Sequence, residues 1–255
     1  MQASETHITQ DVIQVTGVCK AFNDIDVLKN VDLTVAGGEN VAILGRSGSG
    51  KSVFIKILVG LLKADKGNVQ VLGNNVAELD RTQLDRLRLN VGFSFQSSAL
   101  YDSMNVYQNI SFPLAMNAPH MKQDEIRKTV EEVLNAVGLI EKINEFPADL
   151  SGGQRKRVGI ARTLVLKPKI VLYDEPTAGL DPVTSMEIIT LINHVRQLYN
   201  TASVIITHDL TCARKTADRV AMLIDGSFTR IGTFDSVFES DDPQVRSFYN
   251  YNFIK

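Results

Sequence analysis

The chain has 255 residues, of which 44% are hydrophobic and 22% are charged, and its formal net charge at pH 7 is −2. This length and this balance predict a globular protein with one hydrophobic core and room for a subdomain. The charge is close to neutral, which argues against binding to nucleic acid through general neutralisation of phosphates, so we expect no nucleic-acid partner.

The N-terminal third of the chain carries the patterns of β-strands. Residues 12–18 and 31–35 alternate or cluster β-branched side chains, as half-buried strands do. Residues 69–73 indicate a further strand that ends in a turn at Gly73. We expect an antiparallel β portion on this side of the core.

Three runs of the sequence are continuously apolar, at residues 41–44, 170–173 and 204–206. Such runs are typical of strands that are buried on both faces of a largely parallel sheet. They predict an α/β core, and a long interval of the chain separates the first run from the second.

A helical pattern lies within that interval, opened by Asp124 and closed by Gly138. The apolar residues with helical spacing are Ile126, Val130, Val133, Leu134 and Val137. We therefore expect residues 97–165 to form a mainly helical subdomain that is inserted into the α/β core.

A glycine-rich loop follows the first apolar run and precedes an apolar-periodic stretch, which is the context that a phosphate-binding P-loop requires. Its residues are Gly45, Arg46, Ser47, Gly48, Ser49, Gly50, Lys51 and Ser52. Glycines let the backbone approach phosphates closely, and the free N–H groups of a helix N-terminus attract anions. We expect Lys51 to reach the β- and γ-phosphates of a nucleotide and the Ser52 hydroxyl to bind Mg²⁺.

A second segment of small residues begins another apolar-periodic stretch at residues 150–154. After Leu150 it consists of Ser151, Gly152, Gly153 and Gln154. This segment also predicts a helix N-terminus that binds phosphate. The chain thus has two segments that are predicted to bind phosphate, whereas a nucleotide has only one terminal phosphate.

Two adjacent carboxylates, Asp174 and Glu175, end the apolar run at 170–173. Asp174 is placed to hold Mg²⁺ through water, and Glu175 is placed to orient and polarise an attacking water. Adjacent carboxylates also occur in solvated turns, so the pair is informative together with the segment 176–181 that follows it.

These motifs together resemble those of ATP-binding cassette (ABC) ATPases, and the resemblance extends over nearly all 255 residues. It implies one nucleotide-binding domain over residues 1–255, with a P-loop NTPase core of ABC type, an N-terminal antiparallel β portion and the inserted helical subdomain. In that family the segment matching 150–154 binds the ATP that the other subunit holds. The resemblance therefore implies two copies of this chain that bind ATP and Mg²⁺.

The resemblance also gives roles to three residues whose types alone carry little information. His208 matches the histidine that contacts the γ-phosphate, and Gln96 matches the Q-loop glutamine, a ligand of Mg²⁺. Phe22 matches the aromatic residue that stacks on adenine, although a phenylalanine here is about as well explained as a core or edge residue. With Glu175, the residues that we expect to act in catalysis are Gln96 and His208.

Residues 97–116 are unusually apolar for a connecting segment. One interpretation is that they pack within the helical subdomain. The other is that they form a groove for a short helix of a membrane-embedded partner. We expect both interpretations to be partly correct.

Segments 96–104, 109–114, 173–182 and 240–248 resemble the ATPases of bacterial MCE-type transporters, which move phospholipids or other lipids between the envelope membranes. Tyr101 and Gln154 depart from that pattern, since Phe and Met are frequent there. The resemblance implies lipid transport and three kinds of partner: membrane permease subunits, an MCE-type substrate-binding protein and a small STAS-like cytoplasmic protein.

Other functions stay open at this stage. The ATPase of a solute importer is one. A soluble ABC ATPase of DNA repair or translation typically has tandem cassettes, a coiled coil or a zinc insertion, whereas this chain has one cassette and two isolated cysteines, Cys19 and Cys212. An interaction module with a degenerate site is disfavoured because the motif residues are intact.

The sequence has no apolar run of the roughly 20 residues that span a bilayer, and its polar first ten residues do not resemble a secretory signal. We expect the chain to lie at the cytoplasmic face of the inner membrane, held there by a partner. The C-terminal tail, residues 240–255, contains four aromatic residues: Phe248, Tyr249, Tyr251 and Phe253. Exposing them would be unfavourable, so the tail packs either on its own core or on a partner chain.

Overall fold

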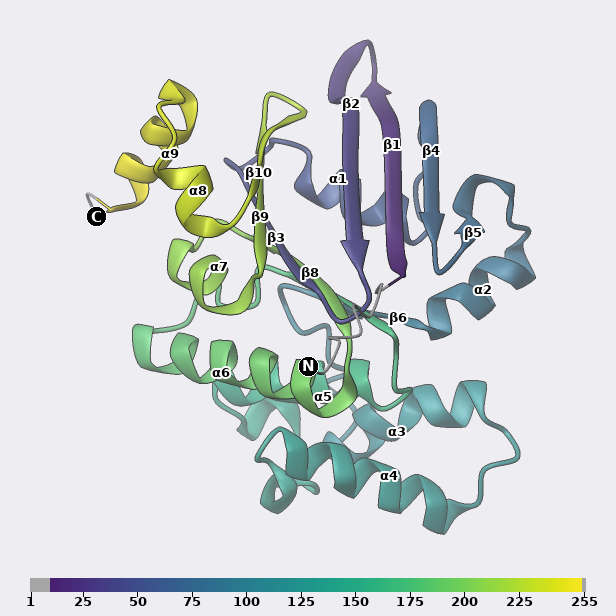
Figure 1. Ribbon diagram of the computed structural model, residues 1–255. Coiled ribbons are helices and arrows are strands. Elements are labelled where there is room, and N and C mark those ends of the chain that lie inside the picture. The colour runs from purple at the N-terminus through teal and green to yellow at the C-terminus, as the bar shows by residue number, and fades with distance from the viewer. Residues whose placement is uncertain (1–9, 254–255) are drawn as a thin grey trace, which may run out of the picture.

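Two β-sheets form the framework of the chain (Figure 1), and the computed structural model describes residues 10–253. The first sheet is antiparallel and has the strand order β2-β1-β4-β5. Its strands are β1 (Asp11–Phe22), β2 (Ile25–Ala36), β4 (Lys66–Val71) and β5 (Asn74–Asn75). The two residues that join β1 to β2, Asn23 and Asp24, both have positive φ (48° and 63°), as a tight hairpin turn requires. This sheet confirms the expected antiparallel portion.

The second sheet is largely parallel and has the strand order β10-β9-β3-β8-β7-β6. Its strands are β3 (Asn40–Leu44), β6 (Val91–Ser94), β7 (Ile170–Asp174), β8 (Ala202–Thr207), β9 (Arg219–Ile224) and β10 (Ser227–Gly232). The three apolar runs form the adjacent parallel strands β3, β8 and β7. The prediction of an α/β core with buried parallel strands is therefore confirmed.

Helices lie alongside the second sheet, and several of them gather at the lower end of the molecule (Figure 1). They are α1 (Lys51–Leu58), α2 (Arg81–Leu89), α3 (Val106–Asn117), α4 (Gln123–Ala136), α5 (Gly152–Leu164), α6 (Pro182–Tyr199), α7 (Leu210–Thr216), α8 (Phe234–Phe238) and α9 (Pro243–Phe253). Short 3₁₀ turns lie at Val76–Glu78, Ile140–Lys142 and Pro147–Asp149. Within residues 10–253, no helix combines the length and the apolar character that crossing a membrane requires.

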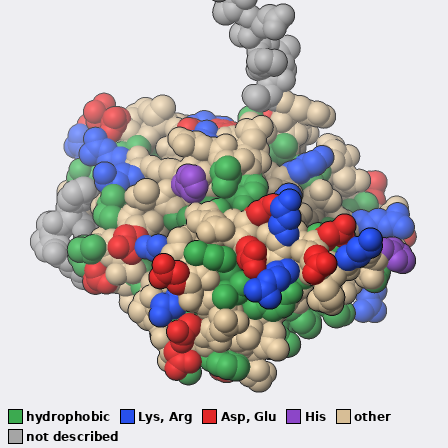
Figure 2. All heavy atoms as spheres, turned by 90° about the horizontal axis from the view of Figure 1, so that it is seen from below, with side chains coloured by type: hydrophobic (Ala, Val, Ile, Leu, Met, Phe, Trp, Pro, Cys, Tyr) green, Lys and Arg blue, Asp and Glu red, His purple; other side chains and the backbone are tan. Residues whose placement is uncertain are grey.

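The inserted helical subdomain consists of α3, α4 and α5, which lie between β6 and β7 in the chain and occupy the lower end of the molecule in Figure 1. The expected amphipathic helix is α4. Seen from that end, acidic and basic side chains are interspersed with hydrophobic ones (Figure 2). Val106, Ile110 and Leu114 of α3 are buried in the same cluster as α4 and α5, so much of the apolar segment 97–116 packs within the subdomain.

The C-terminal helix α9 packs on its own chain. Val245 is fully buried and Phe248 is 4% exposed, in a cluster with Leu44 of β3 and Met222 of β9. The ring of Tyr249 lies 5.3 Å from the ring of Phe238 in α8. Of the two arrangements that the sequence left open, packing on its own core or on a partner chain, the structure has the first. The side chains of Tyr251 and Phe253 lie outside the described residues.

Candidate active site

The P-loop connects the end of β3 to the start of α1, and its conformation depends on glycine at two positions. Gly50 has a φ of 102°, and a Cβ there would lie 2.9 Å from the carbonyl oxygen of Val27. At Gly45 a Cβ would lie 2.4 Å from the carbonyl oxygen of Leu223. Both approaches are closer than real Cβ atoms show, so these glycines allow the loop to pass between β2 and β9.

The start of α1 fits an anion. No side chain caps this helix, and its first turn contains no acidic residue. The buried Lys51 donates to the carbonyl oxygens of Gly45 (2.8 Å) and Arg46 (2.9 Å), which holds its ammonium beneath the loop. Burial lowers the pKa of Lys51, while Glu175 and Asp174 oppose that shift. Free N–H groups, the helix dipole and an ammonium group therefore converge on one point, as phosphate binding requires.

One cavity of about 1000 Å³ collects most of the predicted site residues. Its lining is Val27, Gly45, Arg46, Ser47, Gly48, Gly50, Lys51, Ser52, Val53, Gln96, Asp174, Glu175, Ile206, His208 and Phe248. The groups come from the ends of adjacent parallel strands, which is the usual place of ligand sites in such sheets. Ser49 lines a neighbouring cavity of about 790 Å³ instead.

Glu175 is held towards His208 in this cavity. Its Oε2 lies 2.9 Å from His208 Nδ1 and accepts a second hydrogen bond of 3.3 Å from the His208 backbone N–H. The Glu175 backbone has a φ of 48°, an uncommon conformation for a residue with a side chain. Burial raises the pKa of the neighbouring Asp174, and the charge of Glu175 adds to the increase.

The oxygen donors around the P-loop fit Mg²⁺. Ser52, Gln96 and Asp174 all line the cavity and offer a hydroxyl, an amide carbonyl and a carboxylate. Among the residues that the structure describes, no three His, Cys, Asp or Glu side chains could hold a metal ion together. A small set of hard oxygen ligands suits Mg²⁺, which keeps several waters and binds phosphates alongside one or two carboxylates.

The signature segment, residues 150–154, forms the start of α5. Ser151 Oγ accepts a hydrogen bond from the Gln154 backbone N–H (3.2 Å), and Gln154 Oε1 accepts one from the Ser151 N–H (2.9 Å), which together make a capping box. A Cβ at Gly153 would lie 2.3 Å from Thr184 Cγ2 of α6. Ser151 and Gly152 are exposed, and no signature residue lines the P-loop cavity.

The structure does not bring Phe22 to the P-loop cavity. Phe22 ends β1, is 41% exposed and has Lys20 Nζ 5.2 Å from its ring centroid. Phe248 lines the cavity instead, and Arg46 Nη2 donates to Ser247 Oγ at 3.2 Å. The sequence indicated that the aromatic tail is buried, but nothing in it placed the tail beside the P-loop.

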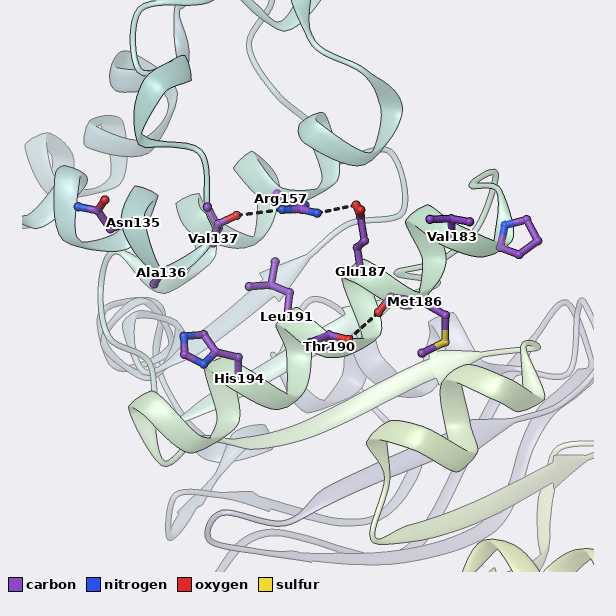
Figure 3. Close-up of a pocket in the computed structure, with 12 residues that line it drawn as sticks. Asn135, Ala136, Val137, Arg157, Val183, Met186, Glu187, Thr190, Leu191 and His194 are labelled. Carbon is purple, nitrogen blue, oxygen red and sulfur yellow. Dashed lines mark hydrogen bonds and ion pairs between the residues drawn. The ribbon is translucent and has the colours of Figure 1, made fainter.

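A third cavity, of about 830 Å³, lies between the end of α4, α5 and α6 (Figure 3). Arg157 of α5 crosses it and pairs with Glu187 of α6 at 2.5 Å. Arg157 also donates to the carbonyl oxygen of Val137 at 3.5 Å. No pattern in the sequence predicted this cavity, which lies on a different face of α5 from the segment 93–99.

Comparison with known proteins gives consistent results. The family described as "ABC transporter" matches residues 28–178. The "Probable ribonucleotide transport ATP-binding protein mkl" of Mycobacterium tuberculosis is 40% identical over 238 residues, which is 93% of this chain and 66% of that protein. The "Methionine import ATP-binding protein MetN" of Rhizobium johnstonii is 36% identical over 242 residues, which is 95% of this chain and 66% of that protein. This chain thus spans slightly less than two thirds of the length of these relatives.

Two solved structures extend the likeness to the fold. The dimeric ATP-binding cassette MJ0796 bound to ADP and Pi has a TM-score of 0.78 and 34% identity, over 87% of this chain and 98% of that one. The cbiO1 protein from Clostridium perfringens, part of the ABC transporter complex cbiONQ, has a TM-score of 0.84 and 31% identity, over 96% of this chain and 97% of that one. The chain therefore belongs to the ABC transporter family.

Proposed function

We propose that the chain is the ATP-hydrolysing subunit of a membrane transporter and that two copies of it share two ATP sites. The observation that supports this most strongly is the separation of the two phosphate-binding segments. The P-loop, Asp174, Glu175 and His208 face one cavity, whereas Ser151 lies outside it. A signature segment that binds ATP must therefore bind the nucleotide of a second copy.

In this proposal the groups of the cavity divide the work of phosphoryl transfer. Lys51 and the N–H groups of α1 hold the β- and γ-phosphates. Ser52, Gln96 and Asp174 hold Mg²⁺, which neutralises phosphate charge when bound. Glu175 orients a water molecule and takes its proton as the water oxygen bonds to the γ-phosphorus, whose bond to the bridging oxygen breaks to leave ADP and phosphate.

His208 has a specific part in this sequence. Its Nδ1 is paired with Glu175 in the structure. Glu175 Oε2 accepts from both the Nδ1 and the backbone N–H of His208, so the other oxygen, Oε1, is the one available to an attacking water, and in this proposal His208 contacts the γ-phosphate when ATP binds. The signature segment of the second copy then closes the site with Ser151, whose hydroxyl hydrogen remains available although its oxygen caps α5.

Turnover by a Glu175→Gln variant tests the proposal. The amide keeps the shape of the side chain but cannot take a proton, so we expect turnover to fall by roughly 10²-fold or more, with ATP binding close to that of the parent protein. Lys51→Ala is expected to lose ATP affinity instead. Glu187→Gln, which changes a carboxylate on α6 outside the cavity, is the matched control. Turnover retained by Glu175→Gln would show that another group activates the water.

We infer that the cargo is a lipid and that the assembly includes permease subunits, an MCE-type substrate-binding protein and a STAS-like protein at the cytoplasmic face of the inner membrane. The resemblance of segments 96–104, 109–114, 173–182 and 240–248 supports this. The exposed Tyr101 (46%) and Met116 (65%) offer apolar surface to a permease.

A solute importer is the second candidate, and the names of the relatives support it equally, since they refer to ribonucleotide transport and methionine import. The assembly purified from detergent-solubilised membranes distinguishes the two. Phospholipid recovered with the complex beyond the level of a detergent control supports lipid transport, and a co-purifying solute-binding protein contradicts it.

A further inference from the structure

Lys156 is a buried lysine in the second turn of α5 and belongs to none of the motifs. Its residue is 8% exposed. Its Nζ donates to the carbonyl oxygen of Gln96 and, at 3.2 Å, to that of Glu175. Lysine is seldom buried unless its charge is satisfied, and here the acceptors belong to two predicted site residues. One ammonium group thus joins α5, the segment after β6 and the end of β7.

The Glu175 end of this link is a backbone that needs support. A φ of 48° lies in the left-handed region, which a residue with a Cβ rarely adopts because of steric strain. Three hydrogen bonds hold it: the Glu175 N–H donates to Ile206 (2.8 Å), and the Glu175 carbonyl accepts from Ala178 N–H (3.2 Å) and from Lys156. The direction of the Glu175 carboxylate follows from this backbone conformation.

The Gln96 end lies in a segment that α5 contacts along its length. Thr163, on the same side of α5 as Lys156, donates to the carbonyl oxygen of Phe93 at 3.2 Å. Arg162 donates to the carbonyl oxygens of Ser98 (2.9 Å) and Ala99 (2.7 Å), both of which have positive φ. The segment 93–99 is therefore fixed to α5 by its backbone, while the Gln96 side chain stays exposed at the cavity.

The charge of Lys156 also belongs to the electrostatics of the site. Burial lowers the pKa of Lys156, and the negative charges of Glu175 and Asp174 oppose that shift. The same two carboxylates act on Lys51. Asp174 and Glu175 thus interact with two buried ammonium groups, one from the P-loop and one from α5.

We propose that Lys156 is a positioning residue that fixes the backbones of Glu175 and Gln96 to α5, the helix that begins with the signature segment. As a result, the groups that hydrolyse ATP at one site move together with the segment that binds the ATP of the other site. This rests on the proposed function of Glu175 and of the signature segment. Lys156 itself contacts neither the water nor the phosphates; it acts through Glu175 and Gln96.

Steady-state hydrolysis by Lys156→Met and Lys156→Arg tests the proposal. Met keeps the length of the side chain but cannot donate, and we expect kcat to fall about 10- to 100-fold, the effect of misplacing reacting groups by about 1 Å. KM and the measured ATP affinity should stay within about twofold, because Lys51 and α1 are unchanged. Lys156→Arg should recover most of kcat. Arg157→Met, which removes the neighbouring charge on the face shown in Figure 3, is the control and should keep the parent kcat.

A mutant cycle with Glu175→Gln and Gln96→Ala separates positioning from a general effect on folding. If Lys156 acts through Glu175 and Gln96, adding Lys156→Met to a chain that carries both Glu175→Gln and Gln96→Ala should lower kcat by less than about twofold. An additive loss, or an unchanged kcat in Lys156→Met alone, would overturn the proposal. If Lys156→Met does not fold, Lys156→Leu, which also lacks a donor, takes its place in the cycle with the same criteria. Full turnover by Glu175→Gln alone would instead refute the proposed function, whatever the Lys156 variants show.

Discussion

The contact of α9 with its own chain leads to a quantitative prediction for Phe248→Ala. Phe248 is 4% exposed and packs with Leu44, Val220, Met222 and Val245. Truncating a buried phenylalanine costs about 3–5 kcal/mol. We expect about 3 kcal/mol, the lower end, because the ring also borders the P-loop cavity. For a domain of this size 1 kcal/mol shifts Tm by about 2–4 °C, so the predicted decrease is about 6–12 °C.

The assay is thermal unfolding of the purified chain without nucleotide, at one scan rate for all variants. Phe146→Ala is the matched control, since Phe146 is 44% exposed and its truncation should change the free energy of unfolding by less than about 1 kcal/mol. If the Tm of Phe248→Ala stayed within about 1 °C of the parent value, α9 would not be bound to its own core in solution. The aromatic residues of the tail would then have to be covered by another chain.

Three further predictions follow from individual contacts. Gly153→Ala should destabilise the chain by about 1–3 kcal/mol, because the new Cβ would lie 2.3 Å from Thr184 Cγ2. The second substitution Thr184→Ser, which removes that methyl group, should restore Tm, and no recovery would mean that this contact is not the cause. Burial, and after it the charge of Asp209, raises the pKa of Cys212 to about 12, so at pH 8 only about 1 thiol in 10⁴ is a thiolate, and mass spectrometry should show that iodoacetamide labels Cys212 only after unfolding. The thiol contributes to the stability of the fold below the unfolded pKa near 9, and that contribution is lost as the pH rises towards 12. Equal labelling of the native and the denatured chain would refute the burial of Cys212. Tyr101→Asp should abolish co-purification with membrane subunits and leave ATP binding intact, whereas a collapsed melting transition would show that Tyr101 serves the fold instead.

The parts of the fold that could be predicted are those in which the residue types directly indicate burial or exposure. The strands β3, β7 and β8 are buried on both faces, so their sequences are continuously apolar. By contrast, β6 contains Gly92, and β10 is an edge strand with an exposed Arg230. These two strands lack a continuous apolar pattern and depend on their neighbours for pairing, so the sequence did not indicate them.

The same distinction applies to the candidate site. Gly50, Lys51 and Ser52 act through a local loop and helix N-terminus, so their spacing in the sequence is enough to predict the arrangement. The contacts of Ser247 with Arg46 and of Lys156 with Gln96 join residues 201 and 60 positions apart. A lysine in an amphipathic helix or a serine in a terminal segment carries no signal of such a partner, because the contact exists only after the chain has folded.

The central claim is that two copies of this chain complete each other's ATP sites. The measurement that tests it most directly is light scattering of the Glu175→Gln variant on a sizing column, with and without ATP and Mg²⁺. The variant should have the mass of one chain without nucleotide and of two chains with it, and the added substitution Ser151→Arg should abolish the dimer while ATP remains bound. A Glu175→Gln protein that binds ATP yet stays monomeric, or one that still dimerises with Ser151→Arg, would contradict the account.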